Sequence, residues 1–202
     1  FFSTPTPPHA ILSGLVGSEM CIRDSGTVGT EQKPGALKIY DGALSDDFCD
    51  DLISVFDSSE PLEIKGENYD ILEYNYTLHH KEEDVHGRLI EHTAKLYKHY
   101  LKDLGTDNMI NVSGFEELKI KKFGHHNLHI DAVDHGSAIR AVGFLFFLNE
   151  STGNIDFPLQ KLGVEPRKGR VIIYPVSWEY PNQHHKTEDF SKYMLETFLH
   201  FA

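Results

Sequence analysis

The pattern of apolar positions predicts helices in the first half of the chain. After Ser45, apolar side chains recur every three or four residues, which predicts a helix capped by that serine. Asp46 and Asp47 would lie in its first turn, where the helix dipole favours anions. A second apolar stripe of the same period predicts a longer helix over 84–104, ended by Gly105.

Beyond Gly105 the pattern changes to that of strands. Segments rich in β-branched and aromatic residues, separated by Gly, Pro, Asn and Asp, cover 115–123, 140–149, 169–175 and 192–201. A short strand around Leu37 and Ile39 and another over 71–79 would add to them. Helices followed by a run of strands predict an α+β fold whose strands close as a jelly roll or barrel.

Composition excludes some classes of function but does not identify one. The 202 residues suit one domain, and a formal net charge of −12 argues against a nucleic-acid partner, because phosphate binding requires clustered Lys and Arg. No apolar run approaches the roughly 18 residues of a membrane span. The two cysteines offer no disulfide framework, so we expect a cytoplasmic protein.

The first 34 residues differ from the rest. The segment "GSEMCIRDS", at 17–25, resembles translated sequencing-adapter tails on environmental gene fragments. We interpret residues 1–25 as a sequencing artefact or a disordered tail, and 26–34 as a flexible lead-in. The functional domain is then expected over 35–202.

Candidate metal ligands gather in "HHNLHIDAVDH", residues 125–135. If 127–131 form a strand, His129 and Asp131 share one face, about 7 Å apart along the backbone. An imidazole and a carboxylate so placed can converge on one ion. The alternative is a polar strand end beside solvent, with His135 and its neighbours in a turn.

A third ligand would come from "PNQHHK", residues 181–186, which follows an apolar strand. Either His184 or His185 would complete two histidines and one carboxylate, a facial triad that leaves three positions of an octahedral iron open. Two of these positions can take a 2-oxo acid and the third can take O₂. A structural zinc site more often uses four ligands, commonly cysteines, and Cys49 has no partner for that.

Lys192 begins the last predicted strand. A lysine that points into an apolar barrel requires an anion, and we expect this one near Phe144, Phe146 and Ile173. The alternative is a solvated lysine at the strand edge. Arg140, entering the strand after the candidate ligands, either faces the substrate or is a structural surface residue.

Several segments together resemble the prolyl-4-hydroxylase-like Fe(II)/2-oxoglutarate dioxygenases, especially the short forms of phages and marine bacteria. They are "LKIYDGALSDDFCDDLISVF", "HID", "RAVGFLFFLNESTGNIDFP", "LGVEPRKGRVIIYP" and "HHKTEDFSKYMLETFL", in the family's order over 36–201. The resemblance implies a double-stranded β-helix, a jelly-roll or cupin-like barrel with supporting N-terminal helices. It implies a hydroxylase that uses Fe(II), 2-oxoglutarate and O₂, releases succinate and CO₂, and for which ascorbate is an optional reductant. It also implies His129, Asp131 and a distal histidine as ligands, and Lys192 as the 2-oxoglutarate anchor.

The chain departs from the family pattern at several positions. One glycine, Gly153, stands where the family usually has two, and Phe123 lies near a position often held by tyrosine. The distal histidine is doubled. Family members place the basic residue nine or ten positions after the ligand, and Lys192 follows His184 by eight and His185 by seven, which favours His184.

Two other classes of protein remain open. One is a cupin-like hydrolase or isomerase that uses the barrel with zinc or manganese. The other is a non-catalytic jelly-roll binding module. Prolyl or other peptide residues, nucleobases and small metabolites are all compatible with the predicted site, and the oligomeric state is left open.

Overall fold

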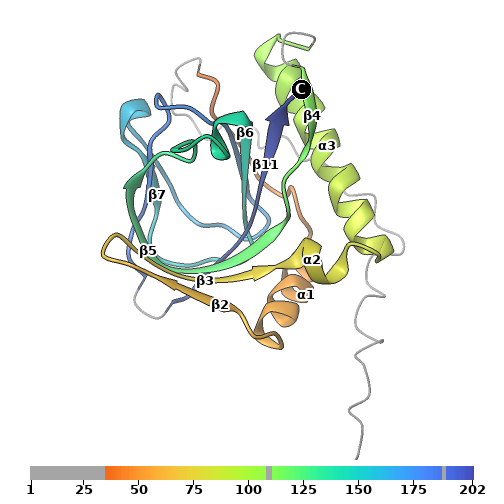
Figure 1. Cartoon of the computed structure of the whole chain (residues 1–202), viewed down its shortest axis with the longest axis vertical. Helices are drawn as coiled ribbons and strands as arrows, with labels where there is room; N and C mark the ends of the chain where they lie inside the picture. The colour runs from red at the N-terminus through yellow and green to blue at the C-terminus, as the bar shows by residue number, and fades with distance from the viewer. Residues whose placement is uncertain (1–34, 108–110, 188–189) are drawn as a thin grey trace, which may run out of the picture.

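The computed structural model describes residues 35–107, 111–187 and 190–202 (Figure 1). The expected tail and lead-in over 1–34 lie outside the described residues. The helices are α1 (Asp46–Asp57), α2 (Tyr76–His80) and α3 (Asp84–Leu104), with short 3₁₀ turns η2 (Ser137–Ile139) and η3 (Pro158–Gln160). The strands are β1 (Lys38–Tyr40), β2 (Leu62–Lys65), β3 (Tyr69–Asn75), β4 (Val112–Phe115), β5 (Lys119–His129), β6 (Arg140–Phe147), β7 (Ile155–Phe157), β8 (Leu162–Val164), β9 (Val171–Pro175), β10 (Asn182–His184) and β11 (Lys192–Phe201).

These strands form one antiparallel sheet that curls into a partly closed barrel (Figure 1). Its central order is β1-β9-β6-β11-β5-β10-β7-β8, with β3 on the free edge of β5 and β2 beyond it. Strand β5 is long enough to pair first with β11 and then with β10. The first half of β5 is therefore held by β11, and its end is held by β10.

The two faces of the sheet bury two separate apolar clusters. Helices α1 and α3 cover the outer face, where Phe144, Phe146 and Leu195 belong to the cluster under the helices. The inner face carries the second cluster, which includes Leu145 and Met194. Because both faces of the central strands are buried, these strands have continuous apolar sequences without alternation.

The fold class and the helices confirm the predictions. The architecture is the expected jelly-roll type with supporting helices. The Ser45 side chain accepts a hydrogen bond from the backbone N–H of Phe48 at 3.4 Å and caps α1. The longer helix runs over 84–104 as expected, and Gly105 ends it with a φ of +67°. Within the described part of the chain, no helix is both long and apolar enough to cross a bilayer.

For two predicted strands, the structure differs from the prediction. The strand expected over 71–79 stops at Asn75, because the side chain of Asn75 accepts a hydrogen bond from Leu78 N–H at 2.9 Å and starts α2. The strand expected over 115–123 is divided, since β4 ends at Phe115 and β5 begins at Lys119. In the segment 181–186, the structure adds a short strand, β10.

Candidate functional site

The candidate site lies where the end of β5 meets β10. The pairing of β5 with β10 matches His129 with Asn182 and His126 with His184, so the four residues 126–129 on β5 lie opposite the three residues 182–184 on β10. The extra residue is a β-bulge, which breaks the simple alternation of faces. The strand also ends at His129, so the expected strand position of Asp131 was wrong: Asp131 lies two residues beyond β5.

His129 and Asp131 nevertheless lie side by side. The Nε2 atom of His129 is 3.5 Å from Oδ1 of Asp131, and its Nδ1 atom is 2.8 Å from the backbone carbonyl oxygen of Asn127. Burial lowers the pKa of His129, but the hydrogen bond and the negative charge of Asp131 outweigh burial, so the net direction is upward. A proton on His129 therefore strengthens the contact between the two side chains, and a metal ion would take the place of that proton.

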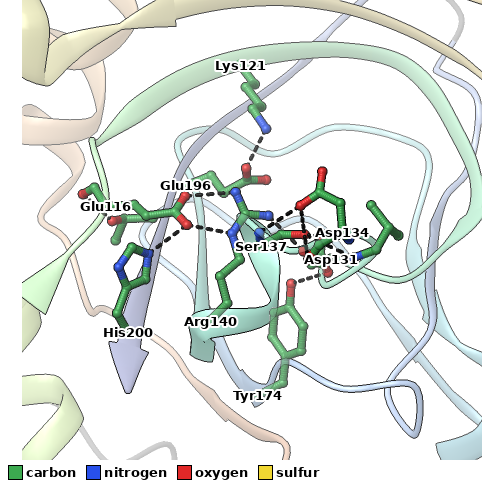
Figure 2. Close-up of polar contacts among 11 residues, drawn as sticks. Glu116, Lys121, Asp131, Asp134, Ser137, Arg140, Tyr174, Glu196 and His200 are labelled. Carbon is green, nitrogen blue, oxygen red and sulfur yellow. Dashed lines mark hydrogen bonds and ion pairs between the residues drawn. The ribbon is translucent and has the colours of Figure 1, made fainter. Parts of the chain in front are cut away.

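The second oxygen of Asp131 is held by neutral donors. The Tyr174 hydroxyl and the Asn182 side-chain amide each donate to Oδ2 at 2.8 Å (Figure 2 shows the tyrosine contact). Burial raises the pKa of Asp131, but these hydrogen bonds, together with the bond to His129 and its charge, bring the pKa down to about 2. Asp131 is consequently ionised across the physiological range.

His184 faces this pair from β10. Its ring stacks on Phe123 at a centroid distance of 4.3 Å and lies 5.9 Å from the ring of His129. Burial and the charge of Lys192 hold the pKa of His184 well below its usual value, so the ring is neutral. His185 instead points to the exposed Asp156 carboxylate, at 2.7 Å, and His135 lies in an exposed turn.

His126 lies in the candidate segment 125–135, but sequence reasoning assigned it no role. Its ring stacks on His129 with centroids 3.5 Å apart and an interplanar angle of 14°. Imidazole lone pairs lie in the ring plane, so two rings stacked face to face do not aim at one ion. Burial, reinforced by His129, lowers the pKa of His126 to about 3. His126 is therefore neutral and supports the orientation of His129. This contact follows from the bulge in β5, which is a feature of the strand pairing.

Lys192 lies inside the barrel. Its side chain is 0% exposed, and its Nζ atom donates to the carbonyl oxygen of Gly153 at 2.8 Å. The distance from Nζ to the carbonyl oxygen of His185 is 3.5 Å. Among the described residues no carboxylate lies within 4.0 Å of Nζ, and burial lowers its pKa to about 7. The ring of Phe123 lies 5.8 Å from Nζ and also stacks on the ring of His184.

The residues expected to surround Lys192 were wrong, because on each strand the adjacent residue, not the expected one, faces the interior of the barrel. Phe144, Phe146 and Ile173 pack under the helices, on the outer face. Lys192 faces inward with the second cluster, whose neighbouring members on the same strands are Leu145, Phe147, Ile172 and Met194. Because both faces are apolar, the sequence alone did not distinguish them.

A cavity of about 570 Å³ opens beside His129 and Asp131. Its wall is largely charged, and each basic group on it is paired. Arg140 donates two hydrogen bonds to Glu116 and one, at 2.8 Å, to the carbonyl oxygen of Asp131 (Figure 2). Lys121 forms a hydrogen-bonded ion pair with Glu196. Arg140 therefore lines the cavity but also braces the loop that carries Asp131.

The residues present fit a metal ion in type, but the two histidine rings would have to move closer together to hold one. Within the described residues, no three His, Cys, Asp or Glu side chains are close enough together to hold an ion as they stand. Two imidazoles bound cis to one ion at 2.0–2.1 Å would have centroids roughly 4.6 Å apart, about 1.3 Å closer than the 5.9 Å between His129 and His184. The Nδ1 atom of His184 is buried without a hydrogen-bond partner in the described part of the chain. We call His129, Asp131 and His184 the candidate triad.

Comparison with solved structures identifies the fold. The chain matches no family model, and no curated protein matches it in sequence. A viral collagen prolyl hydroxylase from Paramecium bursaria Chlorella virus-1, solved with 2OG, has a TM-score of 0.61 and 19% identity over 83% of this chain and 97% of its own. A Pseudomonas putida prolyl-4-hydroxylase has a TM-score of 0.67 and 13% identity over 83% and 94%.

A third similar structure is a prolyl hydroxylase from Trichoplax adhaerens in complex with a hypoxia inducible factor peptide fragment. It has a TM-score of 0.63 and 11% identity over 83% of this chain and 84% of its own. At these identities the likeness shows a shared fold. The chain therefore has the prolyl hydroxylase fold, as the sequence resemblance implied.

Proposed function

We propose that the protein is an Fe(II)- and 2-oxoglutarate-dependent dioxygenase that hydroxylates a peptide residue, of prolyl type, or a small molecule. The observation that carries the proposal is the pairing of two sites within one barrel. The candidate triad supplies two imidazoles and one carboxylate beside an open cavity. Lys192 supplies a buried cation near the Phe123 ring, which stacks on His184.

The donor set favours iron. Two histidines and one carboxylate would hold Fe(II) on one face and leave the opposite positions for a 2-oxo acid and O₂. Bound there, Fe(II) and 2-oxoglutarate would supply the oxidising power for hydroxylation, with release of succinate and CO₂. His129 must lose its proton to bind metal, and Asp131 is already ionised, so metal binding would release the His129 proton.

Lys192 would bind the far carboxylate of 2-oxoglutarate. Among the described residues, this buried ammonium contacts only neutral carbonyl groups, which compensate its charge poorly. A carboxylate would replace those contacts with a charge-assisted hydrogen bond. Inward-facing apolar residues, such as Leu145 and Met194, would exclude water around this pair. Phe123 would contribute packing where the resembled family often has a tyrosine hydroxyl.

Two observations support a peptide or small-molecule substrate. The cavity beside Asp131 is large enough for a side chain or a small metabolite, and one structure with this fold contains a bound peptide. The paired charges on its wall suit a polar substrate group. Arg140 and Glu116, which line the cavity and are bound to each other, could meet such a group.

Metal content and 2-oxoglutarate turnover, measured together on the full chain, test the proposal. Protein reconstituted anaerobically with Fe(II) should bind about one ion. Once O₂ is admitted, it should convert 2-oxoglutarate to succinate and CO₂ slowly even without a substrate. Activity with zinc or manganese but no response to 2-oxoglutarate would instead indicate a cupin-like enzyme of another reaction class. Absence of metal binding would indicate a non-catalytic binding module.

A further inference from the structure

The carboxylate of Asp131 is held asymmetrically. Its Oδ1 atom faces His129, whereas its Oδ2 atom accepts hydrogen bonds from the Tyr174 hydroxyl and the Asn182 amide. We propose that Tyr174 and Asn182 are positioning residues that restrict Asp131 to coordination through Oδ1. The inference rests on the proposed function, because it concerns how this carboxylate would meet the metal.

Tyr174 reaches Asp131 because Gly143 makes room for its ring. The two residues are paired across β6 and β9, and a Cβ atom on Gly143 would lie 2.7 Å from the Tyr174 ring. Real Cβ atoms essentially never approach so closely. The tyrosine is 1% exposed, so its hydroxyl needs a protein partner, and Asp131 provides it.

Asn182 reaches the same oxygen from β10. It pairs directly with His129, two residues before His184, and is 1% exposed. Its Nδ2 atom donates to Asp131, while its Oδ1 atom is buried with no hydrogen-bond partner among the described residues. Such an unsatisfied oxygen costs roughly 1–3 kcal/mol. The opposite amide orientation would place an oxygen against the Asp131 carboxylate. The observed orientation instead gives Asp131 a hydrogen-bond donor.

The backbone of Asp131 is fixed as well. Arg140 donates to its carbonyl oxygen at 2.8 Å, and Glu116 holds Arg140 through two hydrogen bonds (Figure 2). With the main chain and Oδ2 both restrained, the carboxylate has little freedom to rotate. Only Oδ1 is free of neutral donors and turned toward His129.

Coordination through one oxygen determines how many metal positions stay open. A carboxylate bound through both oxygens, with two histidines, would use four of six octahedral positions. Coordination through Oδ1 alone uses three and leaves three, two for a 2-oxo acid and one for O₂. Two donors on Oδ2 also draw charge from the carboxylate and hold its orientation, which is the role of outer hydrogen bonds at metal sites.

Three variants of the full chain test this role. Tyr174→Phe removes one donor and keeps the ring, and Gly143→Ala displaces the ring while keeping the hydroxyl. Tyr100→Phe is the matched control, because it removes a buried hydroxyl that donates to the carbonyl oxygen of Ala36, outside the site. Anaerobic Fe(II) titration gives the affinity, and the visible absorption of the Co(II)-substituted protein reports the coordination number.

We expect Tyr174→Phe and Gly143→Ala to weaken Fe(II) binding roughly tenfold to a hundredfold and to change the Co(II) bands. Tyr100→Phe should lower the melting temperature without changing either readout. The proposal is overturned if both site variants keep the wild-type affinity within about threefold and the wild-type Co(II) spectrum. If the wild-type protein binds neither Fe(II) nor Co(II), the proposed function itself is overturned. If the wild type and all variants bind equally well, only the positioning role is overturned.

Discussion

Replacing Lys192 with methionine should stabilise the protein and weaken 2-oxoglutarate binding. The lysine is 0% exposed, and burial lowers its pKa from 10.5 to about 7. A shift of that size corresponds to roughly 5 kcal/mol of unfavourable free energy for the charged form in the folded protein, an order-of-magnitude figure. Methionine is of similar length and has no charge, so the variant avoids this cost.

The sign of the pH dependence follows from the lowered pKa. Below about pH 7 the lysine is charged in both the folded and unfolded states, so its full cost is present. Between pH 7 and 10.5 only the folded state loses the proton, and wild-type stability rises with pH. The stability advantage of Lys192→Met should therefore be largest near pH 6 and shrink toward pH 10. Denaturant unfolding at several pH values measures it.

Cosubstrate binding should change in the opposite direction. Charge-assisted hydrogen bonds of this type contribute roughly 1.5–3 kcal/mol, so Lys192→Met or Lys192→Ala should raise the dissociation constant and apparent KM for 2-oxoglutarate about tenfold to a hundredfold. Lys192→Arg should retain part of the affinity, since the charge remains. Wild-type affinity should fall above about pH 7, because binding then requires proton uptake by the lysine.

Lys122→Met is the matched control, because Lys122 lies on β5 with its Nζ atom 4.6 Å from the centre of the Tyr193 ring, on the outer face of the barrel. The Lys122→Met variant should have nearly the wild-type free energy of unfolding and nearly the wild-type affinity for 2-oxoglutarate. The reasoning is refuted if Lys192→Met is less stable than wild type at pH 6. Unchanged 2-oxoglutarate turnover in Lys192→Ala would assign the anchor to another basic residue, for which Arg140 and Arg170 are the next to test.

Three further predictions concern the triad, the backbone and the thiol. Alanine at any member of the candidate triad should sharply lower Fe(II) affinity in an anaerobic titration, whereas His135→Ala should not; the reverse result would reject the assignment. Gly169→Ala should lower the free energy of unfolding by roughly 1–3 kcal/mol, because Gly169 has a φ of +75° and its Cβ would lie 2.4 Å from the carbonyl oxygen of Leu44. Gly114→Ala, with nothing within 4 Å, is the control, and equal effects would contradict the strain argument. Burial raises the pKa of Cys49 to about 12, so in a Cys21→Ser variant a thiol reagent at pH 8 should react only after unfolding, and rapid labelling of folded protein would disprove this.

The sequence by itself determined the features that depend on local spacing. The helix over 84–104 and its glycine stop follow from a period of 3.6 residues and from the left-handed conformation that glycine adopts readily. The Ser45 cap follows from one hydroxyl placed three residues before a backbone donor. His129, Asp131 and Lys192 were also found as candidates, because their residue types and order are visible without any coordinates.

Only the tertiary structure decided which side chains surround Asp131. Each position of β6 after Arg140 is buried, so periodicity did not show whether Leu145 or Phe146 faces the interior. A bulge that places four residues of β5 against three of β10 brought His126 onto His129. Tyr174 and Asn182 reach Asp131 from 43 and 51 residues away along the chain. Strand pairing over such separations depends on the register of the whole sheet, and no local sequence pattern encodes that register.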